Sequence, residues 1–372
     1  MLRIVVQVAA VAGSLGAVAW LVDNARVNLA DAGLDTDFDF LDDPADFQIA
    51  FSGFRPGDTV RAALLTGFKN TLIVAAVGIV LTLVLGTIVG IARLSGNWLV
   101  RTAAGAYVET LRNIPPLLVI VFANAAVLLP LPTLRQDAGL EGWLVVSNLV
   151  IVAPSFVAGP GTAAWLAVLA GALVLAGSLG RWRTRRAAAT GAPRLAVVVA
   201  LGTFVVVAAA GYVALGAPVT LSRPSNDGGA VSGGIAMGIP FAAVLIGLTL
   251  YTASHVAEIV RGAIQSVARG QVEAASALAL SPGQRLRFVV LPQAFRVAIP
   301  PVLNQFLNLT KNSSLGIAVG YAELAAVTSV AIPNGSPAPQ AFVVLMGLYL
   351  VVSLSVSGLA NVANRRLQLV ER

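Results

Sequence analysis

Residues 270–280 read GQVEAASALAL, and residues 289–294 read VVLPQA. This short polar island, which also contains Arg285 and Arg287, lies between two long apolar runs at 239–260 and 294–309. Apolar runs of this length are typical of membrane-spanning helices, and basic residues gather in the short loops that join such helices. The stretch therefore indicates a helical membrane protein with a loop outside the hydrocarbon.

The composition supports the same fold class. Of the 372 residues, 57% are hydrophobic and only 11% are charged, whereas soluble domains carry about 25% charged residues. A soluble chain of this size would still need polar residues to cover its surface. Cysteine is absent and there is one histidine, so we expect no disulfide and no metal site. The basic residues that give the net charge of +7 lie beside apolar runs, so membrane topology explains them better than nucleic-acid binding does.

Eight runs approach the roughly 20 apolar residues that a membrane-spanning helix needs. They lie at 4–22, 68–92, 114–131, 162–180, 195–215, 239–260, 294–309 and 341–359. They predict an all-α integral membrane protein. Pro115-Pro116 suits the start of the third helix, whereas Pro300-Pro301 predicts a kink or a restart in the seventh. A cleaved signal peptide is the alternative for 4–22, but this run is longer than a usual signal segment.

Arginines in short loops predict the orientation. With eight spans, the arginine-bearing loops near 93–112, 181–194 and 261–287 and the carboxyl end fall on the cytoplasmic side. The opposite loop, 23–61, contains nine aspartates and three arginines. Both termini are then cytoplasmic. Residues 132–161 and 216–234 are too polar or too rich in glycine to span, so we place them at the outer interface and in an external loop.

The polar island has the pattern of helix, turn and helix. Residues 267–280 favour a helix, Ser281 and Gln284 match a capping box with Pro282 at the first helical position, and a second helix over 284–291 should end before Pro292. Small side chains at Ala274 and Ala275 allow close approach by another surface, and Glu273 offers one charge. From the residues alone, an interfacial amphipathic hairpin without any partner is an equal alternative.

The island resembles the EAA loop of membrane subunits of ATP-binding-cassette importers. Glu-Ala-Ala-x-Ala-Leu at 273–278 and Val290-Leu291-Pro292 carry the resemblance, supported by residues 257–262 and by the segments 67–72, 107–115 and 308–315. Residues 257–262, with Ser266, Gly270 and Gln271, are similar to the polar amino-acid branch of the family. Residues 36–41 resemble its longer subgroup, the general L-amino-acid and glutamate/glutamine/aspartate/asparagine permeases. Ala279 departs from the family, which usually has glycine there, and we expect a slightly tighter helical pocket at that position.

The resemblance implies a type I importer (MetI-like) core and three segments. These are an anchor with an acidic periplasmic loop (1–61), a permease domain (62–366) with an extra hairpin at 162–215 and a coupling loop at 267–292, and a tail (367–372). It implies ATPase-coupling roles for eight residues: Gly270, Gln271, Glu273, Ala274, Ala275, Ala279, Ser281 and Pro292.

The implied partners are ABC ATPase subunits, a second permease subunit (a related paralogue or a second copy), a periplasmic amino-acid-binding protein and membrane lipid. The implied location is the bacterial inner membrane. ATP and magnesium would bind to the ATPase, because this chain has no phosphate-binding Gly-x4-Gly-Lys-Ser/Thr motif and is not expected to be an enzyme. An ion-coupled secondary amino-acid transporter and a membrane scaffold without transport are the rival functions.

Polar residues within the spans are candidates for the translocation path. Asn304, Asn308 and Lys311 recur at helical spacing and share one face, with Lys311 as a candidate partner for a substrate carboxylate. Interhelical hydrogen bonding is an equal alternative for the two asparagines. Tyr251 joins the path candidates because Tyr251, His255 and Glu258 share another face.

Two acid–base pairs lie near the expected cytoplasmic ends of the helices. Glu109 with Arg112 and Glu258 with Arg261 stand three residues apart, so local ion pairs are expected. The family resemblance also makes these four residues candidate gate or strut residues. For His255 we favour a hydrogen-bonded structural role.

Overall fold

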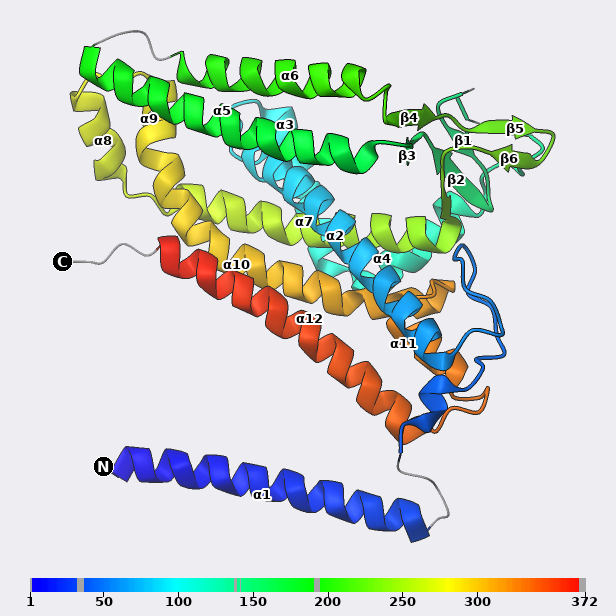
Figure 1. Ribbon diagram of the computed structural model, residues 1–372. Helices are drawn as coiled ribbons and strands as arrows, with labels where there is room; N and C mark the ends of the chain where they lie inside the picture. Colours follow the sequence, from blue (N-terminus) through cyan, green and yellow to red (C-terminus); the bar gives the residue numbers. More distant parts are fainter. Residues whose placement is uncertain (1, 32–36, 137–138, 141, 191–194, 368–372) are drawn as a thin grey trace. The chain divides into compact units, whose positions relative to one another are not determined.

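The computed structural model describes residues 2–31, 37–136, 139–140, 142–190 and 195–367 (Figure 1). The tail predicted at 367–372 lies outside these residues except for Leu367, and the expected limits at 61 and 366 remain predictions. The chain divides into two compact units, Met1–Pro130 with Gly238–Arg372, and Leu131–Met237. The α-helices are α1 (Leu2–Asp31), α2 (Val60–Ala92), α3 (Trp98–Asn113), α4 (Pro116–Phe122), α5 (Thr162–Thr190), α6 (Ala196–Ala214), α7 (Ile239–Gln265), α8 (Arg269–Ala277), α9 (Pro282–Arg285), α10 (Leu291–Asn312), α11 (Leu324–Ala331) and α12 (Ala338–Leu367).

Among the described residues, seven helices are long and apolar enough to span a membrane, and eight if one bent pair counts as a span. The multi-helix fold class is therefore confirmed. The second part of the bent pair occupies the expected third span, whereas its first helix, α3, lies in the arginine-bearing stretch that we expected to be a loop. There α3 meets α4, which continues as a π-helical segment, η2 (Ala123–Leu128), at an angle of 108°. Ile114 is extended at the bend because the ring of Pro115 disfavours helical geometry in the residue before it.

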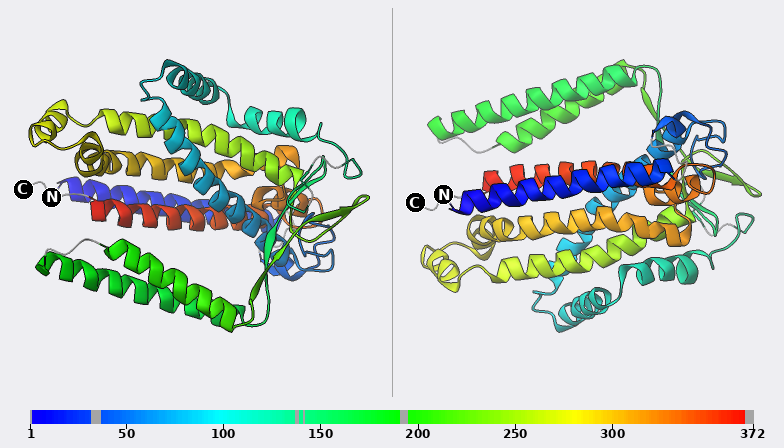
Figure 2. Two further views of the ribbon diagram at one scale, coloured as in Figure 1. Left: turned by 90° about the horizontal axis from the view of Figure 1, so that it is seen from above. Right: turned by 90° about the horizontal axis from the view of Figure 1, so that it is seen from below.

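Glycines allow α2 and α7 to pack with their backbones close together in the first unit. A Cβ atom at Gly86 would lie 2.7 Å from Val256, and one at Gly90 would lie 2.7 Å from the carbonyl oxygen of Ala257. Small residues spaced by four are a usual means of close packing between membrane helices. Figure 2 shows α7 and α10 running alongside one another. The buried clusters of this unit contain residues of α2, α4, α7, α10 and α11.

The seventh span has no restart at Pro300-Pro301, and the kink that was the alternative there stays a prediction. α10 runs from Leu291 through Pro300 and Pro301 to Asn312 without a restart. Pro292 lies in its first turn, after a π-helical segment η3 (Leu286–Val290), so the expected helix end before Pro292 is also wrong. Membrane helices tolerate interior proline because neighbouring groups and local π geometry satisfy the freed carbonyl groups.

The second unit contains short strands, which depart from an all-α chain. They are β1 (Val145–Val146), β2 (Val150–Ala153), β3 (Ser155–Ala158), β4 (Val219–Ser222), β5 (Ser225–Asp227), β6 (Ala230–Ser232) and β7 (Ile235–Gly238). They occupy the segments that we expected to be an outer interface and an external loop. Val150 and Val152 are buried while their neighbours are partly exposed, so β2 shows the alternation of a half-buried strand.

The strands fix the ends of a helical hairpin at the start of α5 and the end of α6. β3 precedes α5, β4 follows α6, and the two strands pair antiparallel with Ser155 opposite Ser222. The Thr162 hydroxyl donates to the carbonyl oxygen of Pro218 at 2.6 Å. Trp165 on α5 packs edge-on against Tyr212 on α6 with ring centroids 5.4 Å apart. The two helices are therefore held side by side at this end.

Candidate functional site

The polar island folds into two short helices outside the long apolar helices. α8 ends at Ala277, and α9 begins after Ser281. The predicted capping box is confirmed: the Gln284 N–H donates to Ser281 Oγ at 3.4 Å, and the Ser281 N–H donates to Gln284 Oε1 at 2.9 Å. The helix expected over 267–280 is shorter than predicted, because α8 covers only Arg269–Ala277.

Ala279 lies in the turn, and not within a helix. Its φ of 56° is in the left-handed region, where a residue with a Cβ atom is disfavoured and glycine is not. The departure from the family's glycine therefore strains the backbone at the end of α8. Our expectation that Ala279 narrows a helical pocket is wrong.

Exposure divides the expected coupling residues into two groups. Gly270, Gln271, Glu273, Ala274 and Ser281 are exposed, as are Ala279 and Pro292. Ala275 is only 3% exposed, so its small side chain packs inside the chain. In contrast, Leu278 is 76% exposed at the end of α8. A large apolar side chain in this position marks a surface suited to a partner, and sequence reasoning missed it.

The two short helices are held together by a side-chain contact. Arg285 Nη1 donates to Ser276 Oγ at 2.6 Å, joining the end of α9 to α8. This contact limits the angle between the two helices, so the loop is a preformed surface. Arg287 lies over the ring of Phe288, 5.7 Å from its centroid.

Glu258 on α7 is the centre of a cluster of three arginines. Its carboxylate forms ion pairs with Arg93, the residue that follows α2, and with Arg261 on its own helix. Arg112 at the end of α3 lies 3.9 Å from the same carboxylate. The local pair of Glu258 with Arg261 is thus confirmed. The expected local pair of Glu109 with Arg112 is wrong, because Arg112 turns towards α7.

A cavity of about 500 Å³ opens beside this cluster. It is lined by residues from the end of α2, from α3 and from α7, including Arg93, Arg101, Glu109 and Arg261. Glu109 therefore remains near the arginines as part of the cavity wall. The cluster joins three helices with an excess of positive charge, and a shift of any one helix would change its ion pairs.

The polar stripe of α10 lies on an exposed face. Asn304, Asn308 and Lys311 are all exposed, whereas Val302, Leu309 and Thr310 are buried. A polar stripe within a span is costly against lipid tails. The exposed asparagines therefore indicate a face that water, substrate or another subunit covers.

Tyr251 and His255 lie on α7 with their rings 4.8 Å apart. Among the described side chains, no hydrogen bond joins Tyr251 to the α10 stripe, and His255 Nε2 is buried without a hydrogen-bond partner. The expectation of a hydrogen-bonded His255 is therefore not met at that atom. Edge-on packing against Tyr251 holds the imidazole ring.

Sequence reasoning also missed Glu323, which is completely buried. It precedes α11 and caps it, since its carboxylate accepts from the N–H groups of Ala325 at 3.0 Å and Ala326 at 2.7 Å. The Tyr349 hydroxyl on α12 donates to Glu323 Oε2 at 2.8 Å. An acid one residue before an apolar helix is an N-cap signal that could have identified this residue.

Two residues of α2 bind the same segment. Asn70 Nδ2 donates to the carbonyl oxygen of Ala322 at 2.7 Å, and the Leu324 N–H donates to Thr71 Oγ1 at 3.1 Å. The Tyr321 hydroxyl donates a hydrogen bond of 2.8 Å to the carbonyl oxygen of Asn70. The Glu323 network therefore joins α2, α11 and α12.

Burial controls the protonation of Glu323, which lies between the spanning helices. Desolvation raises the pKa of its carboxyl above the ordinary value, although its backbone and hydroxyl donors oppose part of that shift. Burial and the nearby Glu323 carboxyl also raise the pKa of Tyr321. The Glu323 carboxyl therefore holds its proton to higher pH than a carboxyl in water does.

The chain is similar to membrane components of transport systems. Residues 172–369 match the family described as binding-protein-dependent transport system inner membrane component. A general L-amino acid transport system permease protein of Rhizobium johnstonii is 40% identical over 96% of this chain and 90% of its own length. A putative amino-acid ABC transporter permease protein of Escherichia coli is 37% identical over 98% of this chain and 94% of its own length.

A third relative is the glutamate/glutamine/aspartate/asparagine transport system permease protein of Rhodobacter capsulatus, 37% identical over 99% of this chain and 94% of its own length. Among solved structures, an amino acid ABC transporter with histidines aligns with a TM-score of 0.49 and 16% identity, over 82% of this chain and 94% of that chain.

Proposed function

Because the chain belongs to the family of inner membrane components of binding-protein-dependent transport systems, we propose that it forms half of the translocation path of an ATP-driven importer and couples that path to a separate ATPase. Its long-matching relatives carry names of amino-acid permeases. Polar L-amino acids are therefore the substrate class, and the chain itself is a non-catalytic subunit of a multi-pass inner membrane complex.

The loop formed by α8 and α9 is the docking surface for the ATPase. Its shape is fixed internally by the capping box and by the bond from Arg285 to Ser276. It presents Gln271, Glu273, Ala274 and Leu278 outward, so a partner meets an amide, a charge, a small residue and an apolar side chain. A rigid loop can transmit a push from the ATPase to α10, which begins directly after η3.

The exposed stripe of α10 is the wall of the path, completed by a second permease subunit. Burial of Asn304, Asn308 and Lys311 against that subunit removes the cost of facing lipid. A paired permease that is related but not identical fits the longer subgroup resembled by residues 36–41. Lys311 would attract a substrate carboxylate, and Tyr251 lies on the neighbouring helix α7.

The Glu258 cluster connects the docking side to the gate. Arg93, Arg112 and Arg261 bring α2, α3 and α7 to one carboxylate. A small rotation of α7 would exchange one of these ion pairs for another, which gives the helices discrete arrangements and not a continuous range.

Arginine distribution supports an orientation with the loop of α8 and α9 and both termini in the cytoplasm. A periplasmic amino-acid-binding protein then delivers substrate on the side of the acidic 23–61 loop. Single cysteines can test this because the natural chain contains none. Cysteine at Ser52 or Ser225 should react with a membrane-impermeant maleimide in intact cells. Cysteine at Gly283, which leaves Ser281 in place, should react only after permeabilisation, and outside labelling at Gly283 would contradict this orientation.

The exposed, preformed loop of α8 and α9 is the single observation that carries the function. The complex should be assembled from this chain with a candidate ATPase, a second permease and a binding protein. In proteoliposomes, uptake of labelled glutamate, glutamine, aspartate or asparagine should require ATP on the loop side and binding protein on the other side. Uptake driven by a proton or sodium gradient without the ATPase would instead establish an ion-coupled transporter.

A further inference from the structure

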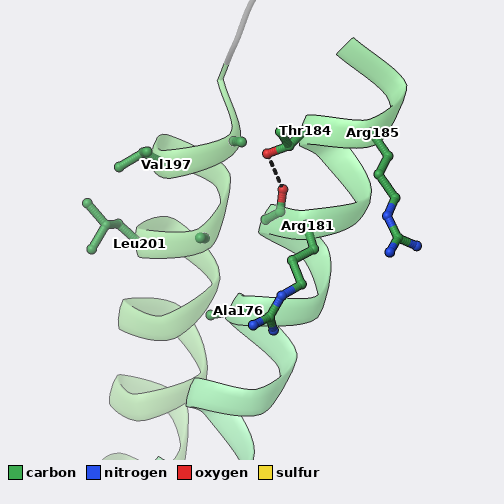
Figure 3. A pocket seen from close by; sticks show the side chains of 10 residues that line it. Ala176, Arg181, Thr184, Arg185, Val197 and Leu201 are labelled. Carbon is green, nitrogen blue, oxygen red and sulfur yellow. Dashed lines mark hydrogen bonds between the residues drawn. The ribbon is translucent and has the colours of Figure 1, made fainter. Parts of the chain in front are cut away.

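The hairpin of α5 and α6 contains the larger of the two described cavities, about 660 Å³ (Figure 3). The cavity lies between the end of α5 and the start of α6. Its floor consists of small residues that include Ala176, Gly177 and Ala200. Arg181 and Arg185 also line it. A volume of this order is sufficient for part of a small organic molecule.

The arginines of this cavity lack acidic partners. Residues 142–226 contain no aspartate or glutamate. Within the described part of the chain, none of Arg181, Arg183, Arg185 and Arg186 forms a salt bridge. Figure 3 shows Arg181 extending along α5 towards Ala176, while Arg185 leaves α5 on the side away from Val197 and Leu201. Arg181 and Arg185 stand four residues apart on one helix face and both line the cavity, so both guanidinium groups can reach an anion held at its edge.

Helix length places these arginines at the depth of lipid headgroups. Arg181 lies about 20 residues along α5 from Thr162. At 1.5 Å per residue this length is about 30 Å, which matches the thickness of the hydrocarbon core. α5 continues from there to Thr190, whereas α6 begins at Ala196. Trp182 marks the same level, since tryptophan is enriched at membrane interfaces. The guanidinium group of Arg186 lies over the Trp182 ring, 4.3 Å from its centroid.

We propose that this cavity binds one anionic phospholipid, with its phosphate on Arg181 and Arg185 and one acyl chain along Ala176, Gly177 and Ala200. A zwitterionic lipid fits less well, because its ammonium group would find no carboxylate in this hairpin. A soluble phosphate would leave the apolar part of the cavity unfilled. The bound lipid would fill the groove between the last turns of α5 and the first turns of α6.

Positive charge at a cytoplasmic membrane surface is common without a specific site. The chain itself supplies the control that separates the two explanations. Arg183 and Arg186 carry the same charge on the same helix, but neither lines the cavity. Similarly, Gly171 lies on α5 outside the cavity, and an added Cβ atom there would meet no atom within 4 Å. At Gly177 an added Cβ atom would meet only Arg181 Nη1, at 3.8 Å.

The test uses the assembled transporter in nanodiscs of phosphatidylcholine with a minor fraction of phosphatidylglycerol. Native mass spectrometry counts the phosphatidylglycerol retained by each complex. R181Q/R185Q removes charge-assisted hydrogen bonds to the phosphate, so it should lower the affinity at least roughly 100-fold. R183Q/R186Q removes only charge near the anionic surface, so its loss should be at least several-fold smaller. Gly177→Leu should lower retention with all arginines present, and Gly171→Leu should not.

Three results would overturn the proposal. The first is undiminished retention by R181Q/R185Q, and the second is equal loss from the two arginine pairs, which would indicate surface charge alone. The third is displacement of the lipid by inorganic phosphate added at ionic strength matched with chloride, which would indicate a site for a soluble anion. Retention is measured without substrate or ATP, so the result is independent of whether the chain imports amino acids.

Discussion

The hydroxyl group of Tyr349 on α12 donates a hydrogen bond of 2.8 Å to Oε2 of Glu323, the residue that caps α11. Because Asn70 and Thr71 on α2 bind the residues on either side of Glu323, this contact completes a junction of three helices. The carboxyl is entirely buried, so each donor that reaches it matters more than a donor at the surface would.

Tyr349→Phe should destabilise the protein by about 1–3 kcal/mol, because it removes a donor from a buried acceptor and leaves the ring in place. Thermal unfolding of the purified complex would measure the loss. Tyr212→Phe in the α5/α6 hairpin removes a hydroxyl bond to a carbonyl oxygen outside this junction and serves as the control for that chemical change. Equal stability of Tyr349→Phe and the natural protein would show that the contact contributes nothing.

The raised pKa of Glu323 predicts a pH dependence of stability. The unfolded carboxyl titrates near its ordinary pKa of 4.5, whereas burial keeps the folded carboxyl protonated to higher pH. The stabilisation is therefore fully present below pH 4.5 and is lost as pH rises through the raised folded pKa. Glu323→Gln cannot titrate, so its difference in unfolding temperature from the natural protein should change across that interval. A constant difference would contradict the buried neutral acid.

Replacement of Glu258 should have a larger effect than replacement of any one arginine around it. Glu258→Gln leaves three guanidinium groups facing one another, whereas Arg112→Gln removes only the most distant and most exposed of them. We expect a loss of about 2–4 kcal/mol for Glu258→Gln and below 1 kcal/mol for Arg112→Gln. Thermal unfolding gives the order, and ATP hydrolysis without transport would report uncoupling. A smaller loss for Glu258→Gln than for Arg112→Gln would contradict the central position of Glu258.

The path assignment predicts a separation of transport from assembly. Asn304→Leu and Asn308→Leu should reduce amino-acid uptake at least several-fold, because an apolar side chain offers no hydrogen bond to a polar substrate or its water. Recovery of the ATPase with the complex should be unchanged. Asn334→Leu, in the turn after α11, is the control for loss of an exposed amide. Unchanged uptake in both α10 variants would reduce the stripe to a packing surface.

Local patterns in the sequence were sufficient to predict much of this structure. Apolar length predicted the spans, and Ser281 with Gln284 predicted the capping box, because the interacting groups lie within a few residues of each other. Pro300 and Pro301 show the limit of such rules, since α10 continues through both. Neighbouring structure can satisfy backbone groups that a proline leaves free, and a local rule does not include that structure.

The remaining features depend on pairs that are far apart in the chain. Thr71 and Glu323 are separated by 252 residues, and Arg93 and Glu258 by 165. No periodicity in the sequence joins such residues, so the partners of Glu323 on α2 and α12 were missed and Arg112 was paired with the wrong acid. Burial of Ala275 was equally hidden, because its exposed neighbour Ala274 has the same side chain.

The coupling surface makes the central claim testable at Glu273, which is exposed on α8. Glu273→Lys reverses a charge at an interface that closes on binding, where loss of a charged contact costs about 2–5 kcal/mol. The variant should insert normally because the residue lies outside the long apolar helices. Glu273→Asp keeps the charge and should retain most of the activity. Ala274→Trp should act like Glu273→Lys by steric exclusion, since Ala274 is exposed and Ala275 is not.

The most direct measurement is recovery of the ATPase with the affinity-purified chain, made for the natural protein, Glu273→Lys and Glu273→Asp at equal membrane expression and paired with ATP-dependent uptake. The account predicts that Glu273→Lys loses both the bound ATPase and the uptake, while Glu273→Asp keeps both. Full ATPase recovery and full uptake with Glu273→Lys and with Ala274→Trp would contradict it, because the loop of α8 and α9 would then not be where the ATPase docks.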